Sequence, residues 1–369
     1  MIKENFIMFI KLKFIFSLFK YLIFLTSISI FLIFCDSDNN QYTGPWKEVP
    51  TPGGEGELNA CYFTSPGNGW ACGNSWNDAE QRSYPLLIHW NGTEWEEYPY
   101  GGWFNNEKFL NIYINDISFC SPNDGWCGGN LEYEYNKRFG FILRYDGQKW
   151  YLFQSHLGES CEPVYALSQN DVWIGVFNDG QTILYHWNGV DLTKYYTPRS
   201  NHGISDIDFY SKDNGIAVGT FAGVWRWNGS ELIEINYDPL DIDFREVACD
   251  TENTAWIIGE DHTEVVIRLE GDKLTKFWDW KGTFKDVYFT SPDNGWIVGG
   301  KWVDEYHTDT WTWHWDGSGW RGIDCPDYMH AWNIFSLGGD NVWIVGNNTK
   351  ENLNPLCSSW KYEPARNIR

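Results

Sequence analysis

Seven copies of one short segment follow one another after residue 45 and limit what this chain can fold into. Each copy joins a turn rich in Ser, Asn, Asp and Gly to an apolar stretch that usually begins with Trp. The reference positions of the copies are Trp70, Trp126, Trp173, Ile216, Trp256, Trp296 and Trp343. These positions lie 56, 47, 43, 40, 40 and 47 residues apart, spacings typical of the four-stranded blades of a β-propeller.

Each copy has the pattern of four short strands. The first strand alternates apolar and polar residues, as in Ile114–Phe119, and the second is the Trp-containing stretch. The third and fourth strands flank an Asn-Gly or Asp-Gly pair, as in residues 88–95 and 142–150. Because these pairs favour positive φ angles, the sequence predicts hairpins with two-residue type I′ turns.

The two ends of the repeat array indicate a closed ring. The last copy ends with its third strand, Cys357–Trp360, and has no fourth. The segment Trp46–Val49 matches the fourth strands Trp95–Tyr98 and Trp320–Ile323. We therefore expect the N-terminal strand to complete the last blade, so that residues 46–369 form a closed, all-β, seven-bladed propeller without open edges.

The repeat also resembles a known class. Gly295–Gly299 reads Gly-Trp-x-Val-Gly and is followed by an apolar strand and an Asp-Gly turn before Trp320. This pattern is similar to the Asp-box and bacterial-neuraminidase repeats, and especially to photosystem II assembly-factor-like propellers, over nearly all of residues 46–362. The resemblance implies a propeller scaffold and suggests an assembly or scaffolding factor of the cell envelope. The turn Asp316–Trp320 is one residue shorter than an Asp box, so sialidase chemistry is not implied.

The first 34 residues differ from the rest. A lysine-containing segment ends at Lys20 and precedes the apolar run Tyr21–Phe34, as in a signal peptide. Cys35 and the polar residues after it resemble a bacterial lipoprotein signal, although Phe34 stands where that family has a small residue. We expect residues 1–34 to be removed, Cys35 to be the lipidated first mature residue, and residues 35–45 to form a short polar linker. An ordinary cleaved signal and an uncleaved membrane anchor are the alternatives, and all three export the propeller to the cell envelope, on the outer surface or in the periplasm.

The charge balance restricts the partners. The chain has 27 Lys and Arg against 50 Asp and Glu, a formal net charge of -23. Phosphate contacts depend on clustered basic residues, so nucleic acid is not an expected partner. We expect a monomer that contacts the membrane only through its N-terminal lipid anchor.

The insertions between repeats indicate which face binds a ligand. Long connections between the second and third strands span residues 74–85, 130–140 and 300–310, and a long link between blades spans residues 99–113. In an up-and-down blade these connections emerge on one face, where repeat proteins usually bind. Aromatic rings beside carboxylates on that face suit sugars, since a ring packs on the apolar face of a pyranose. The expected ligand-binding residues are Trp76, Trp103, Tyr133, Tyr135, Trp302, Asp304, Glu305, Tyr306 and His307.

These residues can alternatively pack the loops onto the propeller rim. We predict a non-catalytic binding module for carbohydrate first and protein second, with a cell-envelope assembly factor and a glycan-cleaving hydrolase as alternatives. Arg144, Arg226 and Arg268 share the repeat position of His89 and are expected to serve the scaffold. The sequence has no zinc-binding motif and predicts no cofactor, while weak Ca²⁺ binding by loop carboxylates stays open.

Eight cysteines follow Cys35, an even number that permits disulfides in an exported protein. Cys120 and Cys127 are expected opposite each other across the turn of the second blade. Cys61 and Cys72 are expected as diagonal neighbours on one face of the first blade. At least one of these pairs is predicted to be oxidised.

Overall fold

The computed structural model describes residues 42–99, 101–104, 109–134, 137–196, 203–235, 242–302, 308–326, 328–348 and 355–364. The predicted signal peptide, Cys35 and most of the predicted linker lie outside these ranges. Over the part that is described, no helix is long and apolar enough to cross a membrane.

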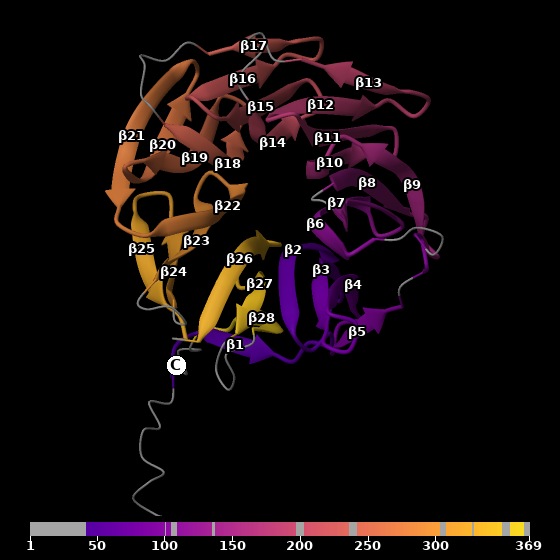
Figure 1. Cartoon of the computed structure of the whole chain (residues 1–369). Helices are drawn as coiled ribbons and strands as arrows, with labels where there is room; N and C mark the ends of the chain where they lie inside the picture. The colour runs from indigo at the N-terminus through magenta and orange to yellow at the C-terminus, as the bar shows by residue number, and fades with distance from the viewer. Residues whose placement is uncertain are drawn as a thin grey trace, which may run out of the picture. The chain divides into compact units, whose positions relative to one another are not determined.

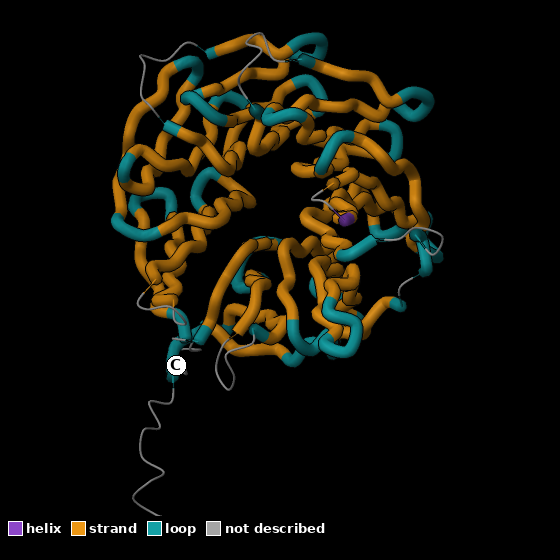
Figure 2. The backbone as a smooth tube through the Cα atoms, in the orientation of Figure 1, coloured by secondary structure: helices purple, strands orange, loops and turns teal. Residues whose placement is uncertain are grey.

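Gly44–Arg369 form one compact unit of seven four-stranded antiparallel sheets arranged as a ring (Figure 1). The predicted all-β, seven-bladed propeller is confirmed. In each sheet, the four strands a to d follow one another outward from the ring axis, and each is hydrogen-bonded to the next. The tube view shows that strands make up most of the ring and that short turns join them (Figure 2).

The first four blades each take their strands a to d from one continuous stretch of chain. Blade 1 has β2 Gly56–Ser65, β3 Asn68–Asn77, β4 Arg82–Trp90 and β5 Trp95–Tyr98. Blade 2 has β6 Asn111–Ser121, β7 Asp124–Tyr133, β8 Lys137–Tyr145 and β9 Trp150–Leu157. Blade 3 has β10 Ser160–Ser168, β11 Asp171–Asn178, β12 Gln181–Trp187 and β13 Leu192–Tyr195. Blade 4 has β14 Ile204–Ser211, β15 Asn214–Gly219, β16 Gly223–Trp227 and β17 Leu232–Glu234.

The other three blades continue in the same order. Blade 5 has β18 Asp243–Thr251, β19 Thr254–Asp261, β20 Thr263–Glu270 and β21 Lys273–Trp280. Blade 6 has β22 Thr283–Ser291, β23 Asn294–Trp302, β24 Thr308–Trp315 and β25 Trp320–Asp324. Blade 7 has β26 Met329–Ser336, β27 Val342–Asn348, β28 Leu356–Tyr362 and, as its fourth strand, β1 Trp46–Val49.

The N-terminal strand closes the ring as predicted. β1 pairs antiparallel with β28, from Trp46 opposite Tyr362 to Val49 opposite Ser359. Figure 1 shows the indigo start of the propeller beside its yellow end. The Trp46 side chain is 1% exposed, and its indole N–H donates to Thr312 Oγ1 of blade 6 at 3.1 Å. The terminal strand is therefore anchored in two blades.

The turn between strands c and d of blade 1 differs in type from the predicted type I′ turn. In blade 1 the pairing resumes at Trp90 and Trp95, which leaves a four-residue loop in place of a two-residue turn. The Asn91 side-chain oxygen accepts from the backbone N–H groups of Thr93 and Glu94, at 2.9 and 3.1 Å. Gly92 supplies the positive φ, 99°. The hairpin prediction is confirmed, but the turn is an Asx turn and not a type I′ turn. The Asn91 side chain accepts hydrogen bonds from the backbone N–H groups of the turn, and Gly92 supplies its positive φ angle.

The repeated Gly of strand b is explained by its neighbour in strand a. A Cβ atom on Gly73 would lie 2.0 Å from the carbonyl oxygen of Glu57, and one on Gly129 would lie 2.1 Å from that of Tyr113. Any side chain here would push the inner strand away. The Trp three residues earlier packs between blades, as Trp70 does at 3% exposure.

The long connections that the sequence placed between strands b and c are mostly strand. In blade 1 the ladder between β3 and β4 continues to Asn77 opposite Arg82, and in blade 2 β7 and β8 pair as far as Tyr133 opposite Lys137. The insertions are thus extended hairpins on the predicted face, which we call the hairpin face.

Candidate binding site

A channel with a cavity of about 1080 Å³ lies among the seven inner strands. Each inner strand carries a register shift near its middle, between Leu58 and Ala60 in blade 1 and between Ile114 and Asp116 in blade 2. Such a bulge inserts one residue and turns side chains off the regular alternation. Consecutive residues of each inner strand therefore line the channel, and they form three layers.

The layer nearest the hairpin face, called the mouth layer, is mixed in charge. It consists of Asn59, Asn115, Glu162, Ser205, Arg245, Lys285 and Trp332. The next layer, called the acid layer, consists of Ala60, Asp116, Pro163, Asp206, Glu246, Asp286 and Asn333. The third layer is opposite the repeated strand-b position and consists of Tyr62, Ser118, Tyr165, Asp208, Ala248, Tyr288 and Phe335.

Three aspartates of the acid layer join one blade to the next. The Asp116 carboxylate accepts from Val164 N of blade 3 at 2.6 Å. In the same way, the carboxylates of Asp206 and Asp286 accept from backbone N–H groups of the following blades, at 2.9 and 2.8 Å. In blade 7 the amide oxygen of Asn333 accepts from Cys61 N at 3.0 Å and closes the ring. These side chains have a structural role that needs an oxygen acceptor at this position.

Burial raises the pKa values of the carboxyl groups in the acid layer. It raises the pKa of Asp116 to about 6, of Asp206 to about 7 and of Asp286 to about 8, against the opposing effect of the backbone donors. Burial, together with the charge of Asp116, also raises the pKa of Glu162 to about 7. Several of these carboxyl groups therefore change protonation state near neutral pH.

Glu246 differs from the aspartates of its layer. Burial and the neighbouring acids Asp206 and Asp286 raise its pKa well above the ordinary value. Its carboxyl lines both the channel and a smaller adjoining cavity of about 340 Å³ that opens toward the hairpin face.

Two cations border the opening. The Arg245 guanidinium bonds to Glu264 Oε1 at 2.6 Å and to the Glu260 carboxylate. Lys285 Nζ lies 4.2 Å from the ring centroid of Trp332, and burial lowers its pKa. The lysine is thus held over an aromatic face, as cations are in cation–π contacts.

Aromatic rings narrow the other end of the channel. Tyr62 and Tyr288 flank Phe335 with ring centroids 4.7 and 4.8 Å away. Tyr165 donates its hydroxyl hydrogen to the Phe209 carbonyl oxygen at 3.2 Å. The channel therefore passes from a charged mouth through carboxyl groups to a more apolar end.

The residues predicted to bind a ligand lie farther out. Trp76 is 38% exposed at the end of β3, and its indole N–H donates to Asp78 Oδ1 at 2.9 Å. Trp103 is half-buried against the core between blades 1 and 2, and its indole donates to the Trp150 carbonyl oxygen at 3.2 Å. Tyr133 is half-buried, 5.5 Å from the ring of Phe139. Of these three residues, Trp76 offers an exposed indole, whereas Trp103 and Tyr133 pack against neighbouring side chains.

The remaining predicted residues are not brought together by the described structure. Trp302 is described through its backbone, which pairs with Thr308. The others, Tyr135, Asp304, Glu305, Tyr306 and His307, lie outside the described ranges.

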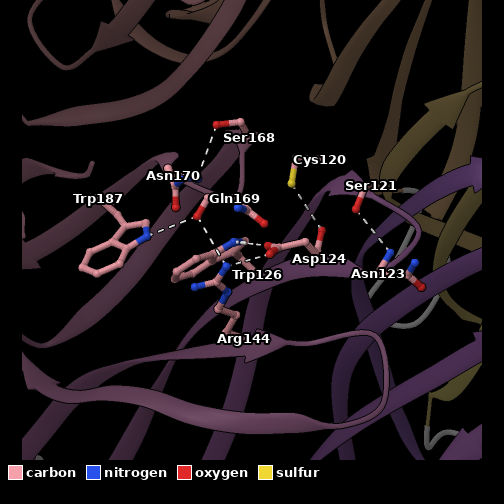
Figure 3. A network of polar contacts seen from close by, with 10 residues as sticks. All are labelled: Cys120, Ser121, Asn123, Asp124, Trp126, Arg144, Ser168, Gln169, Asn170 and Trp187. Atoms are coloured by element: carbon pink, nitrogen blue, oxygen red, sulfur yellow. Dashed lines mark hydrogen bonds and ion pairs between the residues drawn. The ribbon is translucent and has the colours of Figure 1, made fainter. Parts of the chain in front are cut away.

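The predicted scaffold role of the strand-c cations is explained by their contacts (Figure 3). The Arg144 guanidinium lies 4.7 Å above the Trp126 ring and pairs with Asp124 Oδ2 at 2.7 Å. Asp124 also accepts from the Trp126 indole at 2.8 Å. Arg144 further donates to the Gln169 carbonyl oxygen of blade 3 at 3.4 Å. His89, Arg226 and Arg268 occupy the equivalent register position opposite the repeat Trp or Ile, so these side chains serve the scaffold.

The predicted disulfides are not formed, and the eight described cysteines have free thiols. Cys61 lies opposite Ala71 and Cys72 opposite Ala60, so the two point to opposite faces of blade 1. Cys127 lies opposite Ile117, and Cys120 packs on the other side of blade 2. The Cys72 and Cys127 side chains instead pack in the same core cluster between blades 1 and 2.

Among the described residues, no group of three or more His, Cys, Asp or Glu side chains has the arrangement of a metal site. His330 lies in β26, its ring 4.7 Å from Trp332, and burial lowers its pKa to about 4. His307, from the neighbouring blade, is outside the described ranges.

The sequence analysis missed the channel. A signal was present, since acids recur at one repeat position in Asp116, Asp206, Glu246 and Asp286. Their convergence was not visible, because bulges shift the alternation and the ring brings seven distant segments to one axis.

No protein-family model and no curated protein matches this sequence. Solved structures do match. The structure described as YCF48 bound to D1 peptide is 15% identical with a TM-score of 0.59, over 87% of this chain and 98% of that one. YCF48 from Cyanidioschyzon merolae is 17% identical with a TM-score of 0.59, over 86% and 99%. U3-55K is 11% identical with a TM-score of 0.57, over 86% and 98%. At these identities the likeness establishes the fold, and the chain is a seven-bladed β-propeller of the same architecture as these structures.

Proposed function

We propose that this protein is a non-catalytic binding propeller whose ligand is a segment of a partner polypeptide, taken up where the channel opens on the hairpin face. The observation that carries the proposal is the opening itself, lined by amide, carboxyl, ammonium and indole groups around one cavity. An extended chain presents N–H, C=O and side-chain groups together, and such a mixed surface can contact all of them. A solved propeller of the same fold is described as bound to a peptide, which supports this ligand class.

The proposal is tested by selecting peptides from a random display library on the propeller, residues 44–369, which form one compact unit. Selected peptides are expected to bind with micromolar affinity and to lose at least tenfold with Trp332→Ala at the mouth. Val190→Ala, at a 78% exposed position on a c–d turn of the opposite face, should leave binding unchanged. Failure to select any peptide, or equal loss with both variants, would overturn the proposal.

Carbohydrate is the second candidate ligand, and one observation favours it. Trp76 offers an exposed indole whose N–H is held by Asp78, a pairing suited to a sugar ring and its hydroxyl groups. Titration with a panel of polysaccharides, followed by Trp fluorescence, tests it. A saturable shift that Trp76→Ala removes would support a sugar site at this hairpin.

We also propose export and lipid anchoring at Cys35, which would make the propeller a binding or assembly component of the cell envelope. The apolar run before Cys35 and the polar residues after it support this. Cys35→Ser is expected to move the protein from the membrane to the soluble fraction or to leave an uncleaved precursor. Unchanged membrane recovery with a processed N-terminus would contradict lipidation.

A further inference from the structure

The cavity is much richer in acids than in free cations. Carboxyl groups of Glu162, Asp206, Glu246 and Asp286 line it, together with those of Asp116 and Asp208. Of the basic residues that line it, Arg138 is paired with Glu132 at 3.1 Å, and Arg245 is paired with Glu264 and Glu260. The third, Lys285, lies over an aromatic ring. A partner that brings positive charge therefore gains the most from entering.

Two acids of the channel, Glu246 and Glu162, receive no hydrogen bond from a described backbone N–H group. The aspartates Asp116, Asp206 and Asp286 each receive backbone N–H groups. No described N–H group donates to Glu246, whose pKa is raised by burial and by the nearby Asp206 and Asp286 carboxyl groups. Glu162, in the mouth layer, lines the same cavity as Asn115, whose side-chain amide donates to Asn130 and Ser160. Glu246 and Glu162 both line the smaller cavity at the opening, so a cation that enters there meets them first.

The mouth already holds one ammonium group of the chain itself. Lys285 Nζ is 4.2 Å from the Trp332 ring centroid, a geometry that stabilises a partly desolvated cation. Trp332 and Glu246 line the same cavity. This contact, together with the nearby carboxyl groups of Glu264 and Glu57, shows that the walls of the opening accommodate an alkylammonium group.

We propose that the channel receives a Lys or Arg side chain of the partner polypeptide, with its cationic head against the carboxyl groups of Glu246, Asp206 and Glu162. This inference rests on the proposed peptide-binding function and names the chemistry of the peptide. The depth fits, because the mouth and acid layers are consecutive along each strand, about 3.3 Å apart, well within the reach of a Lys side chain. When the cation enters, a proton held by these buried carboxyl groups leaves to solvent, so one positive charge replaces another.

Proton release gives the binding a pH dependence. Groups near these carboxyls include the acids Glu162, Asp116, Asp208 and Asp286, together with Arg245, which precedes Glu246 on β18, and Lys285 on β22. Because the free carboxyl groups hold a proton near neutral pH, the cation has to displace it. Affinity should therefore rise as pH increases from about 5.5 to 8.

The test titrates the propeller, residues 44–369, with hexalysine by isothermal calorimetry at 0.15 M salt. Two matched variants each remove one negative charge. Glu246→Gln changes the channel, and Glu252→Gln changes an exposed turn on the opposite face. We expect at least tenfold weaker binding with Glu246→Gln and less than a twofold change with Glu252→Gln. Equal effects would mean general attraction to an acidic surface and would overturn the proposal, as would the absence of hexalysine binding.

A second measurement needs no variant. Heats recorded in two buffers of different ionisation enthalpy give the number of protons released, expected to be close to one at pH 7. Zero release would overturn the proposal even if Glu246→Gln fails to fold. Spermidine as a competitor separates a polypeptide side chain from a free polyamine, since tighter binding of spermidine than of hexalysine would assign the site to the small cation. If selected peptides bind at the mouth but contain no Lys or Arg, this inference fails while the proposed function stands.

Discussion

The Trp of strand b and the cation of strand c form a repeated pair in which the cation packs over the Trp ring. Arg144 stacks on Trp126 and pairs with Asp124, and its side chain is 18% exposed. Arg144→Met keeps the aliphatic length but leaves the Asp124 carboxylate largely buried beside no cation. We expect the free energy of unfolding to fall by about 2–3 kcal/mol, measured by urea denaturation.

The matched control is another Arg–Asp pair with nearly the same distance. Arg321 lies 3.1 Å from Asp316, but its side chain is 76% exposed. Because solvent screens this pair, Arg321→Met should cost less than about 0.5 kcal/mol. A similar loss for both variants would show that the Arg144 contacts to Trp126 and blade 3 add nothing.

The cysteines make a second residue-scale prediction. The Cys72 and Cys127 side chains are both 0% exposed and meet between blades 1 and 2, whereas Cys61 and Cys120 face other blades. Treatment with diamide should therefore give a Cys72–Cys127 cross-link, identified by mass spectrometry of non-reduced peptides. A Cys61–Cys72 cross-link from folded protein would contradict the register in which β2 pairs with β3.

At the scale of the strand, the inner strands place carboxyl groups where they are costly to ionise. Burial raises the pKa values of Asp116, Glu162, Asp206 and Asp286 to between about 6 and about 8. Between pH 4 and pH 8 these four groups bind more protons in the folded than in the unfolded protein, so their contribution to stability falls as pH rises. Partly buried His330, with its pKa lowered to about 4, opposes only part of this effect, below about pH 6.5. We expect the free energy of unfolding to be about 2–4 kcal/mol lower at pH 8 than at pH 5.

Surface repulsion in a chain of net charge -23 acts in the same direction, so the measurement is repeated in 0.5 M NaCl, which screens exposed charges but not buried ones. Asp206→Asn should reduce the dependence that remains. A stability that does not change between pH 5 and pH 8 in high salt would mean that these groups titrate normally.

The strands themselves could be predicted from the sequence, because alternation and turn residues act over a few positions. Trp46–Val49 was placed correctly in the last blade for the same reason, since it carries the pattern of a fourth strand. The bulges before Ala60 and Asp116 could not be predicted, because each adds one residue that the alternating pattern of the strand does not mark. One such error moved Cys61 and Cys72 onto the same face, since a shift of one residue reverses the direction of a side chain.

At the scale of the whole molecule, the channel exists only when the ring is closed. Each acid of the acid layer comes from a different blade, with Asp116 and Asp286 separated by 170 positions in the sequence. Local patterns carry no information about such convergence. The aromatic residues of the hairpins stood out in the sequence instead, and of these Trp103 proved to be part of the packing between blades 1 and 2.

Closure rests on four residues, so it can be tested by removing them. A chain that begins at Thr51 lacks β1, which loses the Trp46 contacts to Trp296 and Tyr362, with centroids 6.0 and 5.3 Å away, and exposes the edge of β28. We expect a loss of about 3–5 kcal/mol, as for deletion of a buried Trp, and concentration-dependent association in light scattering through the open edge.

Trp46→Ala in the chain that begins at Gly44 separates the two effects. It removes the same indole, which also donates to Thr312, but keeps the backbone pairing with β28. This variant should be similarly destabilised and yet remain monomeric. If it associates as strongly as the truncated chain, the open edge is not the cause. If the truncated chain is as stable and monomeric as the chain that begins at Gly44, the ring does not need its fourth strand, and closure adds little to the stability of the channel.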